Sequence, residues 1–164
     1  NLGGIGTTIA HEITHAFDNT GAKFDAKGLQ KDWWEPKDYE RFEALCKKAA
    51  EFYDGWESAP GIAMNGEQTL GENIADIGGM ACALEALGKT ENPDYDAFFR
   101  AYARGWLKCT TRERAGSLAE IDEHSSSNLR VNRVLSNFQE FYDTYNIKEG
   151  DGMFAAPTER ITIW

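Results

Sequence analysis

The sequence feature that most constrains the fold is a run of apolar residues at three- and four-residue steps between residues 38 and 56. Because an α-helix turns once in about 3.6 residues, this spacing places the side chains on one side of a helix. A helix with such an apolar stripe must be covered along that side, so the chain must fold into packed elements. The residues of the stripe are Phe42, Leu45, Cys46, Ala49, Phe52, Tyr53 and Trp56.

Other segments also have helical periodicity. Helices are predicted over residues 6–17, over residues 70–87, after an N-cap at Asp94, and over residues 127–145. Only the end of the chain, residues 161–164, has the pattern of a short strand. We therefore predict one mainly α unit over the whole chain, with little or no sheet.

Composition excludes several function classes. The formal net charge is -10, from 17 Lys and Arg against 27 Asp and Glu, which disfavours nucleic acid and anionic lipid as partners. No apolar run approaches the length of a membrane span. Since the cysteines are widely spaced and form no CxxC pair, we predict small buried side chains at Cys46, Cys82 and Cys109.

The stretch HEITH holds two of the three histidines in the chain. On a helix, His11 and His15 lie one turn apart on the same side, so both imidazoles can reach one cation. Glu12 is rotated by about 100° from His11, beside the metal, where its carboxylate can take a proton from bound water. Zinc suits imidazole ligands and needs no redox partner. The alternative is a surface helix, and the concentration of histidine here argues against it.

A catalytic zinc usually has three protein ligands and a water. The metzincin spacing would place a third histidine where this chain has Gly21. The stretch NGEQTLGENIADIGG instead offers Glu72 as a ligand, and Asp76 one turn later to hold the N–H of a ligand histidine. Asp18 could hold the ring of His15 in the same way. From the residues alone, Glu72 and Asp76 could equally lie on a solvated acidic helix face. Asp18 could equally be a turn residue at a helix C-terminus.

The third histidine lies in EIDEHSSSNLRVNR, between Asp122 and Arg130. A peptidase needs a donor such as His124 for the oxyanion of its tetrahedral intermediate. An arginine can also grip a backbone carbonyl or carboxylate of a substrate. The residues alone favour a loop that precedes a helix, with Arg130 as a surface cation.

Four stretches together resemble the neprilysin-like (M13) zinc metallopeptidases, which include endothelin-converting enzymes and bacterial oligopeptidases. They are HEITHAFDNTG, NGEQTLGENIADIGG, DEHSSSNLRVN and AAPTERITIW, in the family's order over residues 1–164. HExxH is shared with many zinc enzymes, whereas GENIAD at this distance is more specific. The resemblance implies a thermolysin-like zincin fold (HExxH…E), with this chain as the C-terminal part of the catalytic lobe.

Carried over residue by residue, the resemblance implies one Zn²⁺ ion per chain, held by His11, His15 and Glu72. The other implied roles are Glu12 as general base, Asp18 and Asp76 as partners of the ligand histidines, His124 as the residue that stabilises the transition state, Arg130 as the ligand of a substrate carbonyl and Asp122 as the acid that orients Arg130.

The resemblance also implies a pocket for the substrate residue after the scissile bond. Thr8 stands where many members have an apolar residue that helps to line this pocket. Trp106 and Leu107 keep the pocket partly apolar, so an apolar residue is expected after the cut.

Two departures qualify the resemblance. Mammalian members have cysteines where this chain has Lys108, Ile147 and Thr162, which favours a bacterial cytoplasmic or secreted protein over a disulfide-bonded ectodomain. Family members are also several times longer and have two lobes. We therefore expect a fragment that lacks the upstream substrate-binding strand and the cap lobe.

The predicted function is that of a zinc-dependent endopeptidase that hydrolyses oligopeptides. The present fragment of it is expected to bind metal but to bind peptide poorly. The alternative is a metal-binding or interaction fragment without turnover. A structural zinc domain is disfavoured because Glu12 lies beside an open coordination position. The expected partners are an oligopeptide substrate, the upstream part of the same protein and, through apolar surface left uncovered, a second copy of the chain.

Overall fold

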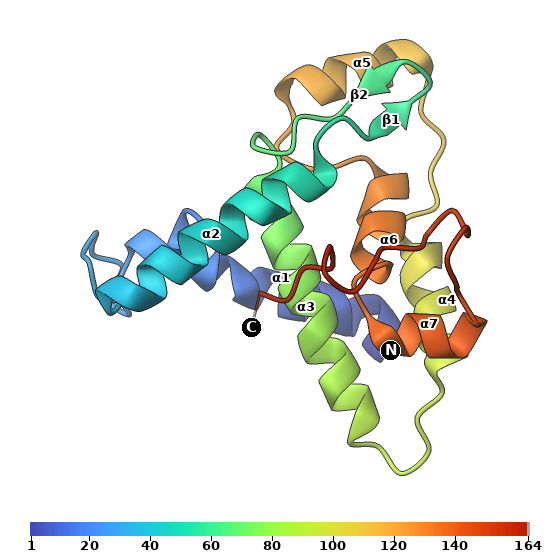
Figure 1. The fold of residues 1–164 in the computed structure, drawn as a ribbon, viewed down its shortest axis with the longest axis horizontal. Coiled ribbons are helices and arrows are strands. Elements are labelled where there is room, and N and C mark those ends of the chain that lie inside the picture. Colours follow the sequence, from blue (N-terminus) through green and yellow to red (C-terminus); the bar gives the residue numbers. More distant parts are fainter. Residues whose placement is uncertain (164) are drawn as a thin grey trace.

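The computed structural model describes residues 1–163, and they form a helical structure (Figure 1). Two short antiparallel strands make the two-stranded sheet of this part of the chain. The prediction of a mainly α fold with little sheet is therefore confirmed. The elements are α1 (Thr7–Thr14), α2 (Pro36–Tyr53), β1 (Glu57–Ala59), β2 (Ile62–Ala63), α3 (Leu70–Gly88), α4 (Tyr95–Gly105), α5 (Arg112–Ile121), α6 (Ser127–Leu135) and α7 (Gln139–Tyr145).

The N-terminal helix changes its winding along its length. A π-helical turn at Leu2–Gly6 leads into α1, and a 3₁₀ turn at His15–Phe17 follows it. The predicted helix over residues 6–17 is thus continuous in direction but not uniform. Such tightening is common at helix C-termini, and here it sets the position of His15 relative to His11.

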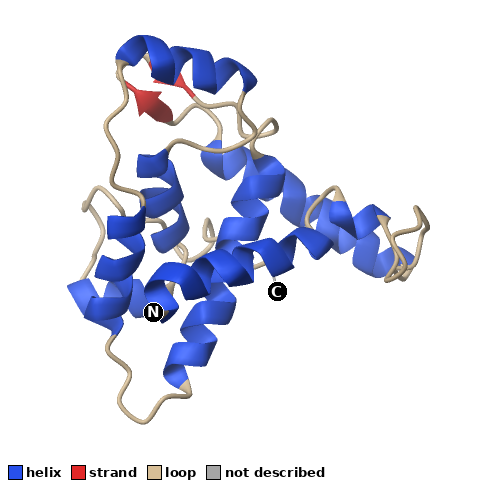
Figure 2. Cartoon of the chain, turned by 180° about the vertical axis from the view of Figure 1, so that it is seen from behind, coloured by secondary structure: helices blue, strands red, loops and turns tan. Residues whose placement is uncertain are grey.

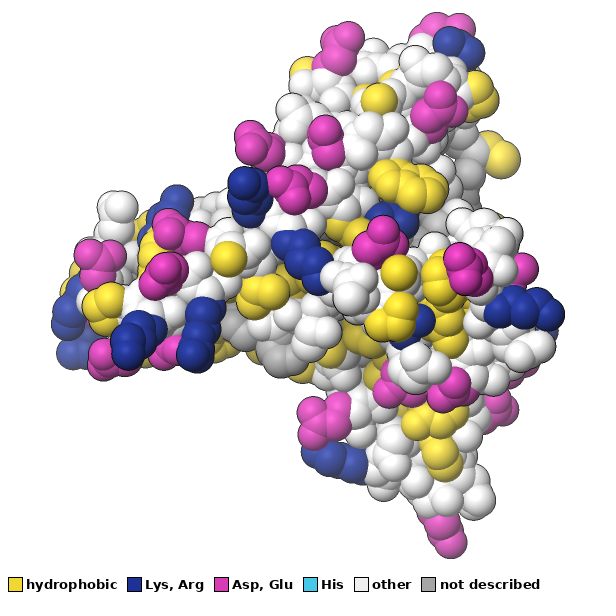
Figure 3. Space-filling view, viewed as in Figure 1, with side chains coloured by type: hydrophobic (Ala, Val, Ile, Leu, Met, Phe, Trp, Pro, Cys, Tyr) yellow, Lys and Arg dark blue, Asp and Glu magenta, His cyan; other side chains and the backbone are white. Residues whose placement is uncertain are grey.

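The helix α2 begins and ends earlier than predicted. Pro36 occupies its first turn, where a missing N–H costs nothing, and the helix ends at Tyr53. Trp56 lies beyond the helix and is 44% exposed, so the prediction of a helix to residue 56 was too long. The outer side of α2 carries interspersed acidic and basic side chains (Figure 3). Among the described helices none is long and apolar enough to cross a membrane.

The single helix predicted over residues 127–145 is wrong, because the chain breaks between α6 and α7. The side chains of Ser136 and Asn137 donate to the backbone oxygen of Arg133 at 3.0 and 2.7 Å. These bonds compete with the helical pattern and end α6. Asn137 also accepts a bond from the backbone N–H of Ile161 at 2.7 Å, which fixes the C-terminal tail.

The structure differs from the predictions in three smaller features. The helix α5 was not predicted, although the hydroxyl of its N-cap Thr111 accepts from Arg114 N as capping residues do. Cys82 and Cys109 are exposed rather than buried, and Cys46 is half-buried. Residues 161–163 form no strand, and Trp164 lies outside the described residues.

Two apolar clusters lie on either side of α3. One joins the second half of α3 to α4, α6 and α7, and its largest fully buried ring is Phe99. The other joins the first half of α3 to α2 and to the tail residues Ile161 and Ile163. The Asp94-capped helix α4 supplies its predicted apolar face to the first cluster, and α2 supplies its predicted apolar stripe to the second. The helix α3 is thus held from two sides.

The close crossing of α1 over α3 depends on a glycine. A Cβ at Gly79 would lie 2.6 Å from the backbone nitrogen of His11 and 2.8 Å from its Cα. No side chain fits in that space, so only glycine lets the two backbones approach this closely. In Figure 2, α1 crosses in front of α3. This crossing brings the HEITH residues next to the acids of α3.

The outer side of the N-terminal helix carries an exposed apolar stripe. Ile5, Ile9, Ile13 and Phe17 recur at every fourth position and are 62, 54, 64 and 40% exposed. The Phe17 ring lies 6.4 Å from that of Trp33, which is itself 43% exposed. Contiguous apolar surface of this kind is typical of a binding face rather than of a solvated one.

This stripe predicts that the isolated chain self-associates. We expect the average mass in static light scattering to rise across a concentration series, because association removes the stripe from water. The double variant Ile9→Gln, Ile13→Gln should reduce this rise, whereas Ile121→Gln, at an exposed isoleucine (77%) on α5, should not. A chain that stays monomeric throughout the series would contradict the prediction.

Candidate metal centre

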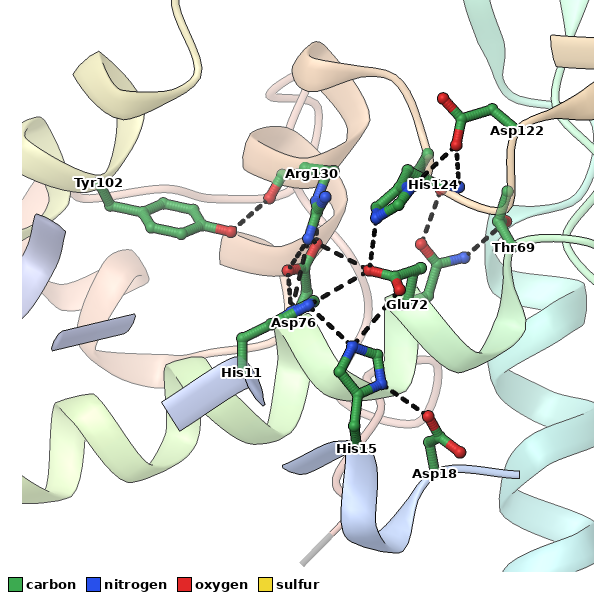
Figure 4. A network of polar contacts seen from close by, with 12 residues as sticks. His11, His15, Asp18, Thr69, Glu72, Asp76, Tyr102, Asp122, His124 and Arg130 are labelled. Atoms are coloured by element: carbon green, nitrogen blue, oxygen red, sulfur yellow. Dashed lines mark hydrogen bonds and ion pairs between the residues drawn. The ribbon is translucent and has the colours of Figure 1, made fainter. Parts of the chain in front are cut away.

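Three side chains, from α1, from the 3₁₀ turn that follows it and from α3, meet at one point beside the α1–α3 crossing (Figure 4). The Nε2 atoms of His11 and His15 are 3.1 Å apart. Glu72 on α3 places one carboxylate oxygen 3.2 Å from the Nε2 of His11 and the other 3.4 Å from that of His15. The three donor atoms all lie within 4.8 Å of one another. This spacing suits three ligands of one small cation.

Each imidazole is held from behind by a carboxylate. The Nδ1 of His11 lies 2.8 Å from Asp76 Oδ1, and the Nδ1 of His15 lies 2.7 Å from Asp18 Oδ2. A proton on Nδ1 satisfies these contacts and leaves both Nε2 lone pairs directed at the same point. The sequence predicted these four residues together, and the structure brings them together.

Asp18 is itself fixed by the backbone that follows it. Its Oδ1 accepts from the N–H groups of Thr20 and Gly21, both at 2.7 Å. The chain turns back so tightly that a Cβ at Gly21 would lie 1.9 Å from the backbone oxygen of His15. Only glycine therefore fits at position 21, where a metzincin would have its third histidine.

The electrostatics of this cluster favour a cation. Burial lowers the pKa of His11, but the carboxylates of Asp76 and Glu72 outweigh it and raise the pKa to about 9. Burial raises the pKa of Glu72, but the neighbouring imidazoles, with His11 first, bring it below its usual value. The carboxylates of Asp76 and Glu72 therefore favour a positive charge at this point, which in the metal-free chain is a proton on His11.

The donor set fits a metal ion such as zinc. Glu72 Oε2 is buried and accepts no well-aligned hydrogen bond from the described residues, although the imidazole nitrogens of His11 and His124 each lie 3.2 Å away. A buried carboxylate oxygen without such a bond is costly unless a cation neutralises it. Two imidazoles and one carboxylate are a ligand set typical of catalytic zinc.

Glu12 stays outside the ligand set. It is exposed and lines a hollow of about 140 Å³ beside His11, whose wall also includes Thr8, Trp106 and His124. The side chain of Leu107, predicted to line the same pocket, does not reach it. Leu107 is 79% exposed and borders an adjoining cavity of about 650 Å³, whose wall shares Trp106, His124 and Arg130 with the hollow.

His124 comes to the site from the loop between α5 and α6. Its Nε2 lies 3.2 Å from Glu72 Oε2, and its Nδ1 lies 2.7 Å from Asp122 Oδ1. The same Asp122 oxygen accepts from the backbone N–H of His124 at 3.0 Å. The pair therefore holds the ring with Nε2 toward the hollow.

Arg130 is not the surface cation that its local sequence favoured. It is 7% exposed, and its Nε and Nη2 donate to the two oxygens of Asp76, both at 2.7 Å. Its guanidinium stacks 4.1 Å from the Trp106 ring centre, and its backbone oxygen accepts from Tyr102 OH at 2.7 Å. The acid that orients Arg130 is thus Asp76, which corrects the expectation for Asp122.

Sequence reasoning missed a buried link between α3 and the His124 loop. Ser125 Oγ donates to Asn73 Oδ1 at 2.7 Å, and Asn73 Nδ2 donates to Thr69 Oγ1 at 2.9 Å. Thr69 and Asn73 are one turn apart on a helix, which is the spacing of a bonded pair, but nothing local connects them to Ser125.

Comparisons with known proteins agree with this geometry. Residues 1–161 match the model of peptidase family M13. A neutral endopeptidase of Lactococcus lactis subsp. cremoris is 45% identical over 164 residues, which is all of this chain and 26% of that protein. The chain therefore spans about a quarter of the length of such relatives.

Solved structures show the same fold. The crystal structure of PEPO from Lactobacillus rhamnosis HN001 matches all of this chain with a TM-score of 0.94 and 42% identity, over 26% of its own length. The Mycobacterium tuberculosis zinc metalloprotease ZMP1, solved with an inhibitor, matches with a TM-score of 0.93 and 34% identity, over 27% of its length. The expected zincin fold is confirmed, and the chain belongs to peptidase family M13.

Proposed function

We propose that this chain forms the zinc-binding part of an endopeptidase that hydrolyses oligopeptides. The observation that carries the proposal is the convergence of three donor atoms from His11, His15 and Glu72 beside the open carboxylate of Glu12. A structural zinc site would be closed by a fourth protein ligand, and this one has a hollow instead. The relatives include a neutral endopeptidase and a zinc metalloprotease, which agrees with this chemistry.

A zinc ion bound to this set would polarise the scissile carbonyl and acidify the attacking water. Glu12 takes the proton of that water and later gives it to the leaving amine. His124, held by Asp122, donates from Nε2 to the oxyanion when its ring is protonated. The Nη1 group of Arg130, which Asp76 leaves free, binds a backbone carbonyl of the substrate.

The substrate residue after the cut is proposed to enter the hollow of about 140 Å³. Its wall combines the Trp106 ring and Thr8 with ionisable side chains that include Glu12 and Arg130. The Trp106 ring is the contact proposed for a small or medium apolar side chain. The Thr8 hydroxyl adds a polar edge to this pocket. Leu107 borders the neighbouring cavity instead of this hollow.

The chain is proposed to act within a longer protein, together with a part that binds the substrate backbone. It spans about a quarter of its relatives' length, and the apolar stripe on the outer side of α1 offers a surface for further chain. The isolated chain should therefore bind metal and cleave peptides far more slowly. Peptide hydrolysis with and without a chelator separates this function from a metal-binding fragment without turnover.

The first prediction concerns the third ligand. Glu72→Ala should weaken zinc binding by more than about a hundredfold, because losing even an outer partner of a metal site costs about 10–100-fold. The measurement is a zinc titration against a competing chelator. Glu85→Ala is the matched control, since Glu85 is an exposed acid on the same helix. Full zinc occupancy in the Glu72 variant would refute the ligand assignment.

The second prediction concerns pH. Because the pKa of His11 in the metal-free chain is raised to about 9, His11 is protonated at pH 7 and must lose that proton to bind metal. Zinc affinity should therefore rise about tenfold per pH unit from about pH 7 to pH 9 and level off above it. Calorimetry in buffers of different ionisation enthalpy should record about one proton released at pH 7. An affinity that is flat across this range would contradict the assignment.

The third prediction concerns Glu12 in a protein of the relatives' length that carries this chain. Glu12→Gln should keep zinc and lower the rate of peptide hydrolysis about 10²–10⁴-fold, because an amide cannot accept the proton. Metal analysis and a peptide cleavage assay measure the two effects, with the exposed Glu51→Gln as control. Retained zinc with a near-normal rate would show that Glu12 is not the base.

A further inference from the structure

The loop that carries His124 is tied to α3 by a buried chain of hydrogen bonds (Figure 4). Ser125 donates to the side-chain oxygen of Asn73, whose amide nitrogen donates to the hydroxyl of Thr69. Thr69 in turn donates to the backbone oxygen of Asn65 at 3.2 Å. Ser125, Asn73 and Thr69 are 4, 1 and 0% exposed. The hydrogen bonds all run in one direction, with Ser125 donating to Asn73, Asn73 to Thr69, and Thr69 to the backbone of Asn65.

A second bond ties the same loop to the same helix region from the other side of His124. The side-chain amide of Gln68 donates to the backbone oxygen of Asp122 at 2.7 Å. Residues on both sides of His124, at 122 and 125, are therefore fastened to the segment that begins α3. The His124 ring itself is exposed and has contacts with Asp122 and Glu72.

The position of His124 matters more than its burial. Loops between helices move more readily than the helices they join, and a shift of about 1 Å in a catalytic group can cost about a hundredfold in rate. Glu72, the proposed metal ligand, directly precedes Asn73 on α3. These two neighbouring residues therefore face different parts of the site: Glu72 faces the histidines of the metal centre, and Asn73 bonds to the loop of His124.

We propose that Asn73, Ser125 and Gln68 are positioning residues, which hold the Nε2 of His124 at the distance from the metal ligands that oxyanion stabilisation needs. This inference rests on the proposed peptidase function. It assigns the three residues no contact with substrate, and Asn73 acts through Ser125. Because Glu72 and Asn73 both lie on α3, this helix positions the proposed metal ligand and the His124 loop relative to each other.

The test uses a protein of the relatives' length that carries this chain. Ser125→Ala should lower kcat about 10–100-fold while KM and zinc content change little. Ser125→Thr keeps the hydroxyl and should restore kcat to within a few-fold. Ser127→Ala is the matched control, because the Ser127 hydroxyl is buried without a partner among the described residues.

A double-mutant cycle separates positioning from a general structural role. In a His124→Ala background, Ser125→Ala should lower kcat no further, because the group that it positions is gone. An equal loss of kcat in both backgrounds, or a near-normal kcat in the single variant, would overturn the inference. If His124→Ala alone leaves kcat unchanged, the proposed role of His124 in the reaction fails instead, and the inference fails with it.

Inhibitor binding supplies a readout besides activity. A phosphinic peptide presents a tetrahedral oxyanion to His124, whereas a simple thiol binds only the metal. Ser125→Ala should weaken the phosphinic peptide about tenfold or more and leave the thiol unchanged; equal weakening of both would count against positioning. If Ser125→Ala does not fold, Gln68→Leu, at a half-buried site, should show the same pattern with a smaller effect. An unchanged kcat in Gln68→Leu would then overturn the inference.

Discussion

The carboxylate of Asp76 is the contact on which the rest of the site depends. One of its oxygens faces the Nδ1 of His11 at 2.8 Å, and both accept from Arg130 at 2.7 Å, so it joins α1, α3 and α6. Its side chain is 4% exposed, and a charge this deep is stable only when it is paired. Because removing one partner of a buried pair costs about 3–5 kcal/mol, Asp76 fixes the proposed metal ligand His11 and Arg130 together.

The helix α3 organises the site because its successive side chains face different neighbours. Glu72 and Asp76, one turn apart, face α1 and Arg130, while Asn73 faces the loop of His124. At Gly79 the same helix lets the backbone of α1 come close enough for His11 to meet both acids. Apolar clusters on both sides of α3 keep it in place, so a buried scaffold carries the polar groups.

The residues proposed to hold the metal site and those proposed to react with substrate differ in burial. His11, Glu72, Asp76 and Arg130 are buried, whereas Glu12 and His124 are exposed at the hollow. Buried ligands are preorganised by their partners, while a proton carrier must reach both water and substrate. This division agrees with the chain's membership of peptidase family M13.

Several local features follow directly from residue spacing: the helical class, the His11–His15 pair on one side of a helix, and Glu72 and Asp76 one turn apart. Helical periodicity reports contacts within a few residues, so these features could be read directly. The folded chain shows three further features that spacing did not predict: Arg130 is buried on Asp76, Asp122 holds His124, and α6 ends before residue 136. The Arg130–Asp76 pair joins residues 54 positions apart, which only packing brings together. The Asp122–His124 contact and the bonds that end α6 are local, but the same residues suit other local arrangements until the surrounding chain, such as Ile161 bonded to Asn137, selects one.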